Sequence, residues 1–519
     1  MSYLFLTGAT GLLGTYLLRD FASHGVRVVA LVRSTKFASA EQRVEDALSR
    51  WEGLVGHTLP RPIVLEGDIS KPGLGLDDQS RDWVSRHCSS LMHNAASLTF
   101  HAESPEGEPW RSNVNGTRNV LEFCRQTGIR DFHHVSTSYV CGLRTDLARE
   151  DELDVGQELG NDYEISKVQA EKMVYAADHL EQRTFYRPAI IVGDSEDGYT
   201  TTFHGFYVPL KLLSALVGKT SALKLSRDEL AAINRASSER LRELLNLDGS
   251  EQKNYVPVDW VSAVMAHVYA HPEHHGKTYH LTPANRVPVT TMQSVFEQAF
   301  TDYTVSTSSA EDTSVDWMNF EKYFVEQMGV YRSYWRNDPV FDSTNTMRAA
   351  PHLPCPRVDR EMLLNMCRYA MDSNFGWPRP KSAVAEFDVD GHLALLAESA
   401  QGAEPEESVR VVANLEVNGP GGGQWQLAEQ GGALVVTEAG LAEDASTTVF
   451  MNSQTFAELA SGRMSIEESI ATGRTLVEGA LAEAGGLSDE RVSEVVARLL
   501  GRVEPFIGVT TPTTTKSWE

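Results

Sequence analysis

Cysteine is scarce in this sequence. The 519 residues include five cysteines, Cys88, Cys124, Cys141, Cys355 and Cys367, and no pair of them has C-x-x-C spacing. An odd number of scattered thiols argues against a disulfide framework and against a cysteine-ligated zinc site. We therefore expect free thiols in a protein of a reducing compartment, the cytoplasm.

Long apolar runs are also missing. No stretch approaches the roughly 18 consecutive apolar residues that a membrane span requires. The first residues lack a basic segment and reach Gly8 before the apolar region of a signal peptide could form. The sequence predicts neither a signal peptide nor stable membrane insertion.

Positive charge is in short supply. Lys and Arg number 46 against 71 Asp and Glu, which gives a net charge of −25. Binding to nucleic acid through its phosphates requires clustered cations, so we expect no nucleic-acid partner. The sequence does not fix the oligomeric state, and an oligomer stays open.

Strand and helix patterns alternate through the first third of the chain. The short apolar runs are residues 3–6, 27–32, 63–65, 90–93, 132–135 and 184–186, and helical periodicity fills most intervals between them. Such alternation implies right-handed crossovers. It predicts an α/β fold with a Rossmann-like, doubly wound parallel sheet.

A glycine-rich turn lies between the first strand and the first helix, in Thr7-Gly8-Ala9-Thr10-Gly11-Leu12-Leu13-Gly14. Gly8 permits the tight turn, Gly11 lets the backbone approach a pyrophosphate, and Gly14 lets the helix pack closely on the sheet. The N–H groups of the helix start face the anion. The predicted cofactor-binding residues of this turn are Gly8, Thr10, Gly11, Leu12 and Gly14.

The end of the second strand indicates which dinucleotide binds. An acidic residue at this position would bind the ribose 2′-OH of NAD, but the sequence has Arg33 instead. A cation suits the 2′-phosphate of NADP, and Arg43 could add a second contact. The alternative is that Arg33 is an ordinary surface residue.

Tyr163 and Lys167 are four residues apart and so lie on one face of a predicted helix. A phenol with a pKa near 10 is a poor acid or base at neutral pH. The neighbouring ammonium group, helped by an oxidised nicotinamide, is expected to lower that pKa, and Lys167 can also reach the nicotinamide ribose. The strand end Val135-Ser136-Thr137-Ser138 supplies a hydroxyl that can bind a substrate carbonyl oxygen.

These motifs together resemble the extended short-chain dehydrogenase/reductase superfamily over residues 1–375. Further matching segments are Gly67-Asp68-Ile69, Asn94-Ala95-Ala96, Asn113-Val114-Asn115-Gly116-Thr117, Arg187-Pro188-Ala189-Ile190-Ile191 and Val256-Pro257-Val258-Asp259. Within the superfamily the sequence is most similar to thioester reductases and fatty-acyl reductases.

The resemblance implies roles for individual residues. Asp68 and Ile69 would flank the adenine, Asn94, Ala95 and Ala96 would line the cofactor, and Pro188 to Ile191 would pass under the nicotinamide. Asn113 would support the relay beside the active site. Thr137 would be the catalytic hydroxyl, with Ser136 and Ser138 as competitors, and Tyr163 and Lys167 would complete the catalytic set.

The implied reaction is hydride transfer from NADPH to an acyl thioester. Thr137 and Tyr163 would stabilise and protonate the developing oxyanion. The hemithioacetal would collapse to an aldehyde, which a second hydride could reduce to an alcohol. We expect the thioester to come from CoA or a separate carrier protein. Ser97-Leu98-Thr99 departs from the usual pattern of these reductases. This departure concerns the assignment of an acyl thioester as the substrate more than the assignment of the redox chemistry.

Residues 200–250 and 283–375 are expected to form a small substrate or lid subdomain. Ser226 to Glu229 has the pattern of a helix capping box. The apolar residues Leu230, Ile233, Leu241, Leu244 and Leu245 follow it with the spacing of one helical face. His271, His274, His275 and His280 lack the periodicity of metal ligands, so no metal site is predicted.

A different pattern begins after Trp377-Pro378-Arg379-Pro380. Four predicted strands, near residues 409–417, 424–427, 433–437 and 447–451, precede two short helices near 453–460 and 465–472. The segment from Thr447 to Gly479 resembles the sterol-carrier-protein lipid-binding family, and the resemblance covers residues 385–505. It implies an α+β domain with an apolar tunnel for acyl chains or sterols, although the domain could instead only pack or dimerise.

The sequence therefore predicts an NADP(H)-dependent reductase of a fatty or polyketide-type acyl thioester. Its cofactor-binding core would cover about 1–200 and 250–282, with a linker at 376–384, the sterol-carrier-like domain at 385–505 and a flexible tail at 506–519. One alternative is a dehydrogenase of a sterol-like or other lipid alcohol or ketone. Another is a non-catalytic, NADP-binding lipid carrier or sensor.

Overall fold

The computed structural model describes most of the chain. The described residues are 2–56, 59–220, 226–307, 317–377, 389, 391, 393, 410–418, 422–430, 433–442, 445, 447–472 and 474–479. The chain divides into two compact units, Met1–Val32 with Leu65–Lys381, and Arg33–Val64 with Ser382–Glu519. Most of the predicted linker and all of the predicted tail lie outside the described residues.

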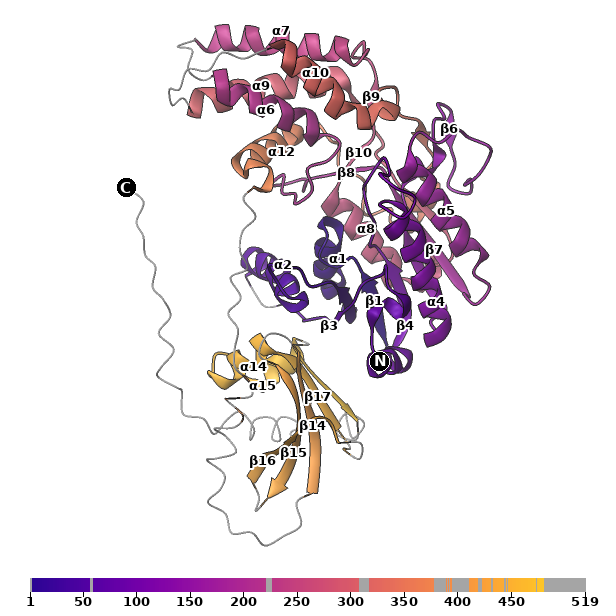
Figure 1. The fold of residues 1–519 in the computed structure, drawn as a ribbon, viewed down its shortest axis with the longest axis vertical. Helices are drawn as coiled ribbons and strands as arrows, with labels where there is room; N and C mark the ends of the chain where they lie inside the picture. The colour runs from indigo at the N-terminus through magenta and orange to yellow at the C-terminus, as the bar shows by residue number, and fades with distance from the viewer. Residues whose placement is uncertain are drawn as a thin grey trace. The chain divides into compact units, whose positions relative to one another are not determined.

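A seven-stranded sheet has the strand order β11-β7-β5-β4-β1-β2-β3 (Figure 1). Its strands are β1 (Tyr3–Thr7), β2 (Val28–Val32), β3 (Ile63–Glu66), β4 (Cys88–His93), β5 (Asp131–Val135), β7 (Gln182–Pro188) and β11 (Thr278–Leu281). The pairs from β11 to β2 are all parallel. The order reverses at β1, which confirms the predicted doubly wound fold.

Helices connect these strands as the alternating pattern predicts. They are α1 (Leu12–Ser23), α2 (Ala40–Val55), α3 (Asp78–His87), α4 (Thr117–Thr127), α5 (Asp162–Ala176) and α8 (Val258–Ala270). Helix α5 starts at Asn161, whose side chain accepts a hydrogen bond from the backbone N–H of Glu164. This cap fixes the start of the helix that carries Tyr163 and Lys167.

Three short two-stranded pairs lie outside the main sheet. They are β8 (Ile190–Val192) with β10 (Tyr255–Pro257), β9 (Gln252–Lys253) with β12 (Val287–Pro288), and β6 (Leu147–Ala148) with β13 (Val340–Phe341). The β8–β10 pair is parallel, and β8 follows the carboxyl end of β7 directly in the chain.

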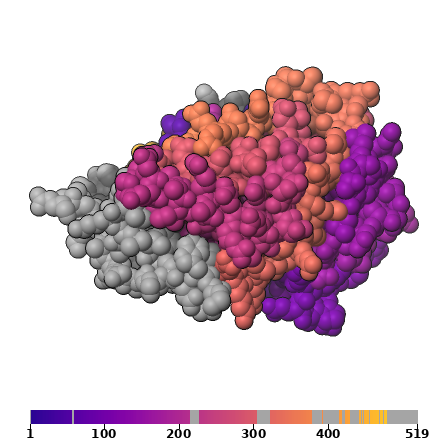
Figure 2. Space-filling view, turned by 90° about the horizontal axis from the view of Figure 1, so that it is seen from above, coloured from indigo at the N-terminus to yellow at the C-terminus, as the bar shows by residue number. Residues whose placement is uncertain are grey.

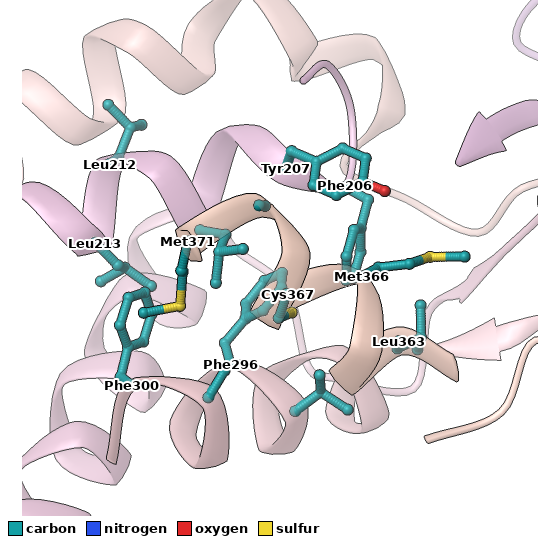
Figure 3. Packing of buried hydrophobic residues seen from close by; sticks show 14 of the residues in the cluster. Phe206, Tyr207, Leu212, Leu213, Phe296, Phe300, Leu363, Met366, Cys367 and Met371 are labelled. Carbon is teal, nitrogen blue, oxygen red and sulfur yellow. The ribbon is translucent and has the colours of Figure 1, made fainter. Parts of the chain in front are cut away.

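A group of helices gathers next to β8 and β10 (Figure 1). Its members are α6 (Tyr207–Thr220), α7 (Arg227–Leu244), α9 (Val289–Thr307), α10 (Trp317–Met328) and α12 (Arg360–Asp372), with α11 (Thr344–Ala349) between α10 and α12 in the chain. Figure 2 shows its two stretches of chain, magenta and orange, side by side on one face. Phe206, Tyr207, Phe296, Leu363 and Cys367 belong to its shared apolar core (Figure 3).

Helix α7 confirms the predicted capping box and corrects one predicted core residue. The Ser226 side chain accepts from the Glu229 N–H, and the Glu229 side chain accepts from the Ser226 N–H. Leu230, Leu241 and Leu245 are buried, but Ile233 is 41% exposed. Ile233 lies about 60° around the helix from Leu230, at the edge of the apolar stripe, so its predicted burial is wrong.

The carboxy-terminal sheet has five strands in the order β16-β15-β14-β17-β18. Its strands are β14 (Arg410–Asn418), β15 (Gly423–Gln430), β16 (Ala433–Ala439), β17 (Thr447–Asn452) and β18 (Thr475–Gly479), with helices α14 (Ser453–Ala460) and α15 (Ile466–Ala471) after β17. Only the β14–β17 pair is parallel among the pairs of this described sheet. The predicted α+β pattern is confirmed.

The cysteines and the helices can be compared with the predictions of free thiols and of no membrane span. All five cysteines are free thiols, and four of them are buried. Among the helices of the described ranges, none combines the length and the apolar character needed to cross a bilayer.

Candidate active site

The glycine turn takes the conformation that its sequence predicts. Gly8 has φ +74°, and a Cβ atom on Gly8 would lie 2.7 Å from the backbone nitrogen of Ala95. A Cβ on Gly14 would lie 2.0 Å from the backbone oxygen of Gly8. Both positions therefore require glycine because the backbone approaches too closely for any side chain.

Gly11 differs from the other two glycines. It is exposed, and a Cβ on it would meet the Gly8 oxygen at 3.5 Å, an ordinary contact. It is also the N-cap of α1, and no side chain caps that helix. The backbone N–H groups at the start of α1 therefore have no side-chain cap, and Thr10 and Leu12 beside them are only half-buried. This arrangement forms a cradle of N–H groups that suits a pyrophosphate.

The carboxyl end of β4 braces this turn. The Asn94 side-chain amide donates to the Gly8 oxygen at 3.1 Å, and the Ala95 N–H donates to the Thr7 hydroxyl at 3.1 Å. His93 contacts the same hydroxyl through Nδ1 at 2.8 Å. Burial lowers the pKa of His93 to about 3, with the Lys167 charge as a second cause, so its ring is neutral. The support of the turn by Thr7 and His93 was not predicted, because it joins two strand ends that are far apart in the sequence.

Asp68 and Ile69 follow β3 and lie against α4. The Asp68 carboxylate accepts from the Ser70 N–H at 2.8 Å, and the Ile69 oxygen accepts from the Asn119 amide at 2.8 Å. A Cβ on Gly116 would lie 2.8 Å from the Ile69 side chain. These contacts place the Asp68–Ile69 turn at the carboxyl edge of the sheet, where the predicted adenine contacts would form.

Arg33 and Arg43 are neighbours. Arg33 follows β2 directly and is exposed, while the Arg43 guanidinium donates to the Arg33 backbone oxygen at 2.6 Å. Burial and then the charge of Arg33 lower the pKa of Arg43. Two cations held this close repel each other, and an anion between them would relieve that repulsion.

Thr137 lies just beyond the carboxyl end of β5, and its hydroxyl is close enough to the phenol of Tyr163 to favour a lower pKa of that phenol. The Thr137 hydroxyl also lies 3.4 Å from the backbone oxygen of Pro188. The structure therefore brings together two of the predicted catalytic groups and the start of the segment expected under the nicotinamide.

The neighbouring serines behave differently. Ser136 and Ser138 are buried, and within the described residues neither hydroxyl oxygen has a hydrogen-bond partner. Of these three hydroxyls, that of Thr137 is the one that acts on the pKa of the Tyr163 phenol. This difference favours Thr137 as the hydroxyl that shares a substrate oxygen with Tyr163.

The pKa of Tyr163 departs from the sequence-based expectation. Burial raises it well above 10, and the hydrogen bond with Thr137 opposes that shift only in part. Lys167 is not among the causes. The expected lowering of this pKa is therefore not a property of the protein alone, because the desolvation of the phenol is the largest cause of its shift.

Lys167 is 4% exposed, and its ammonium group donates to the Val135 oxygen at 2.8 Å. Burial lowers its pKa to about 8, while the negative charge of Glu171 opposes the shift. The hydrogen bond holds the amine at the end of β5, two residues before Thr137. Lys167 can thus act on a cofactor bound at that strand end.

Asn113 supports the site through α5 rather than by touching the phenol. It lies in a π-helical turn, Trp110–Gly116, and donates to the Ser166 hydroxyl at 2.9 Å. Ser166 in turn donates to the backbone oxygen of Tyr163 at 2.7 Å. Asn113 also accepts from the Ser97 N–H at 2.8 Å, which ties the Ala95–Ala96 loop to the catalytic helix.

An aromatic group covers Tyr163. The Phe100 ring lies 5.7 Å from the Tyr163 ring, 5.0 Å from Tyr331 and 5.6 Å from Tyr334, measured between centroids. Tyr331 and Tyr334 belong to the segment that follows α10, about 165 residues from the catalytic helix. No local pattern in the sequence links these two tyrosines to Tyr163, because the contact joins distant segments of the chain.

Comparison with known proteins identifies the family. Residues 6–265 match the family described as Male sterility protein, and that span is half of the chain. The chain belongs to this family. Residues 393–488 match the SCP-2 sterol transfer family. Both resemblances that the sequence indicates are confirmed, and the Male sterility match implies a nicotinamide cofactor, which the glycine cradle fits.

Curated relatives extend the family assignment. The chain is 24% identical over 411 residues to an aldehyde reductase, lnaA, of Aspergillus flavus, which covers 70% of this chain and 36% of that protein. It is 26% identical over 292 residues to the nonribosomal peptide synthetase asaC of the same species, 54% of this chain and 26% of that protein. The chain therefore spans about a third or less of the length of these relatives.

Solved structures of reductase domains share the fold. The terminal R domain of the myxalamid PKS-NRPS biosynthetic pathway matches with a TM-score of 0.53 and 25% identity, over 72% of this chain and 92% of that domain. The reductase domain of a nonribosomal peptide synthetase from Mycobacterium tuberculosis matches with a TM-score of 0.51 and 18% identity, over 72% and 92%. An extended short-chain dehydrogenase/reductase fold is thereby confirmed.

Proposed function

We propose that this protein is an NADPH-dependent reductase of acyl thioesters. The observation that carries the proposal is the placement of the Thr137 hydroxyl beside the Tyr163 phenol, with a buried Lys167 at the same strand end and a glycine cradle that suits a dinucleotide. The aldehyde reductase and nonribosomal peptide synthetase relatives, and the R-domain structures, support a thioester rather than a simple ketone as substrate.

The chain's own groups have distinct tasks in the proposed reaction. NADPH, when bound, supplies the hydride that adds to the thioester carbonyl carbon. Thr137 and Tyr163 donate hydrogen bonds to the carbonyl oxygen, and Tyr163 gives it a proton. The resulting hemithioacetal loses the thiol and leaves an aldehyde. A second NADPH and a second proton would convert the aldehyde to an alcohol.

The high pKa of Tyr163 agrees with this direction of reaction. A phenol that keeps its proton is a hydrogen-bond donor and an acid, which are the roles that carbonyl reduction requires. Lys167 is held at the end of the same strand, where it would be placed to bind the nicotinamide ribose of the cofactor. The protonated phenol thus suits reduction better than alcohol oxidation, which would need the phenolate at the start.

The preference for NADP rests on Arg33 and Arg43. Their mutual proximity supports a site for a dianion such as the ribose 2′-phosphate. The aromatic residues Phe100, Tyr331 and Tyr334 would cover the acyl group next to Tyr163 and exclude water from the reacting carbonyl.

The decisive experiment follows NADPH oxidation by the purified full chain with a long-chain acyl-CoA and with an acyl group on a carrier protein. Tyr163→Phe should lower kcat/KM at least about a hundredfold because the proton donor is lost. Tyr175→Phe is the matched control, since Tyr175 lies on the same helix and is 46% exposed. Unchanged turnover in Tyr163→Phe would overturn the mechanism.

A second candidate function is the oxidation or reduction of a sterol-like or other lipid alcohol or ketone, which the SCP-2 match favours. Assaying acyl-CoA, a fatty aldehyde and a sterol ketone side by side distinguishes the two. Turnover of the sterol ketone alone would favour the second candidate. NADPH binding without turnover of any of them would favour a lipid carrier or sensor.

A further inference from the structure

Three chemically reactive side chains meet at the edge of the sheet opposite to the catalytic residues. Asp131 and His133 lie at the amino end of β5, and His275 lies in the loop before β11. One ligand atom of each residue lies within 4.8 Å of the other two. In the described part of the chain, this is the one such group of histidine, cysteine or acidic residues.

Two of the three distances within the group resemble those between the ligands of one metal ion. His133 Nε2 lies 3.4 Å and His275 Nδ1 lies 3.1 Å from Asp131 Oδ2. Ligands about 2.0–2.1 Å from a tetrahedral zinc ion are separated by roughly 3.3 Å. The side chains of His133, His275 and Asp131 are 0%, 8% and 25% exposed, so the group is mostly shielded but open to solvent at the carboxylate.

The other ring nitrogens are held by neighbours outside the group. His275 Nε2 lies 3.0 Å from the Tyr269 backbone oxygen, which can only accept, so this nitrogen carries a proton. Burial opposes it, but the Asp131 carboxylate produces a net rise in the pKa of His275, so a metal ion would displace the Nδ1 proton and take up the lone pair of that nitrogen. His133 Nδ1 lies 3.1 Å from the Tyr186 hydroxyl, which leaves its Nε2 facing Asp131.

One oxygen of the Asp131 carboxylate has no partner. Its Oδ1 is buried and has no hydrogen-bond partner among the described residues. A buried carboxylate oxygen without a partner is costly. A cation next to both carboxylate oxygens and the two imidazole lone pairs would satisfy all of these groups at once.

We propose that Asp131, His133 and His275 bind a divalent transition-metal ion, with Zn²⁺ as the best match. Two imidazoles and one carboxylate are a common zinc set, and their outer nitrogens already have the hydrogen bonds that orient metal-bound histidines. A water would fill the fourth position at the exposed carboxylate side.

The proposed ion would have a structural role. Asp131 and Val135 lie at opposite ends of β5, about 13 Å apart at the usual rise per residue, and the catalytic Thr137 lies beyond Val135. The ion would instead tie β5 to the loop that leads into the edge strand β11, across the intervening β7. We expect it to hold that edge strand in place without changing the hydride transfer.

A second histidine cluster provides the necessary control. The rings of His267, His271, His274 and His352 lie 4.1 to 6.1 Å apart. Their ligand atoms do not converge as those of the proposed site do. These half-buried or exposed imidazoles could nevertheless bind added metal weakly and must be tested separately.

The experiment titrates Zn²⁺ into the full chain after chelator treatment and measures binding by calorimetry and the melting temperature in parallel. The wild type should bind one equivalent and gain melting temperature. Asp131→Asn and His275→Gln should each weaken binding at least tenfold, whereas His274→Gln and His352→Gln should leave the tight site unchanged. Substituting Co²⁺ should give the visible absorption of tetrahedral coordination in the wild type and not in His275→Gln.

Two results would overturn the proposal. Absence of Zn²⁺ binding by the wild type would mean that a proton joins His275 to Asp131 as an ordinary ion pair. Binding that persists in both Asp131→Asn and His275→Gln would assign the metal to other residues. If Asp131→Asn fails to fold, His275→Gln alone tests the site. NADPH turnover tests the proposed function separately, and neither of these two results affects it.

Discussion

The ammonium group of Lys167 donates a hydrogen bond to the backbone oxygen of Val135, 2.8 Å away, at the last residue of β5. This contact fixes a buried cation beside the strand end from which Thr137 projects. Burial lowers the Lys167 pKa to about 8 and raises the Tyr163 pKa well above 10. Around neutral pH the amine is charged and the phenol keeps its proton.

The rate of reduction should therefore fall on the alkaline side as Lys167 loses its proton. Because the lowered pKa is about 8, kcat/KM should be constant below that pH and decline about tenfold per pH unit above it. The measurement is a pH profile of NADPH oxidation with acyl-CoA. Lys172→Arg, on the exposed side of the same helix, should keep this profile, and a constant rate to about pH 10 would contradict the assignment.

Lys167 should also make the protein less stable than it could be. Its folded-state pKa lies below 10.5, so burying the charged amine destabilises the fold fully below about pH 8 and progressively less as the pH rises to 10.5. Since one pH unit corresponds to about 1.4 kcal/mol, the cost is roughly 3 kcal/mol before the hydrogen bond to Val135 is counted.

Lys167→Met should accordingly raise the free energy of unfolding by about 1–2 kcal/mol at pH 7 and abolish turnover. The gain should shrink as the pH approaches 10.5. Denaturant titrations at pH 7 and at higher pH measure this difference. A variant that is less stable than the wild type at pH 7 would show that the hydrogen bond outweighs the desolvation of the amine.

The glycine turn allows packing to be separated from cofactor binding. Gly14→Ala would place a Cβ 2.0 Å from the Gly8 oxygen and should destabilise the protein by about 3 kcal/mol or more. Gly11→Ala meets nothing closer than 3.5 Å and should cost under about 1 kcal/mol. Thermal unfolding measures both changes in stability.

Gly11→Ala should nevertheless weaken NADPH binding at least tenfold, because its methyl group would occupy the exposed surface that the pyrophosphate approaches. Unchanged affinity in Gly11→Ala would show that the pyrophosphate does not bind against this turn. Equal losses of stability in both variants would contradict the packing argument.

Local patterns predicted much of this protein. The strands, the glycine turn, the Ser226–Glu229 capping box and the carboxy-terminal sheet all follow from residue spacing, because neighbours in sequence decide them. Ile233 shows the limit, since its burial depends on how wide a face the neighbouring helices cover. Periodicity alone cannot give that width.

Contacts between distant segments could not be predicted. His275 meets Asp131 across about 140 residues, and Tyr331 and Tyr334 reach Phe100 from beyond α10. The direction of the Tyr163 pKa also depends on burial, which the Tyr-x-x-x-Lys spacing does not report. The sequence thus indicates which groups are present, while tertiary packing determines the environment that tunes them.

Arg33 and Arg43 should set the choice between NADPH and NADH. Replacing either guanidinium removes a charge-assisted hydrogen bond, which corresponds to roughly a tenfold to hundredfold loss of NADPH affinity. Arg33→Ala and Arg43→Ala should leave the KM for NADH nearly unchanged, because NADH has no 2′-phosphate. Steady-state kinetics with both cofactors measure the ratio, and parallel losses for NADH and NADPH would contradict the assignment.

Glu171 should link the stability of α5 to the charge of Lys167. Its carboxylate accepts two hydrogen bonds from Arg187, at 3.0 and 2.7 Å, and both side chains are almost fully buried. Glu171→Gln leaves the Arg187 charge buried without its counter-charge and should destabilise the protein by about 3–5 kcal/mol. Glu122→Gln, which removes the exposed pair with Arg125, should cost under about 1 kcal/mol.

Glu171→Gln should also change the pH profile in a direction that a merely structural role would not produce. The Glu171 charge opposes the lowering of the Lys167 pKa, so its loss should move that pKa further below 8. The alkaline decline of kcat/KM in Glu171→Gln should then begin at a lower pH than in the wild type, whereas Glu122→Gln should leave it in place. A loss of stability with an unchanged profile would mean that Glu171 holds Arg187 but does not act on Lys167.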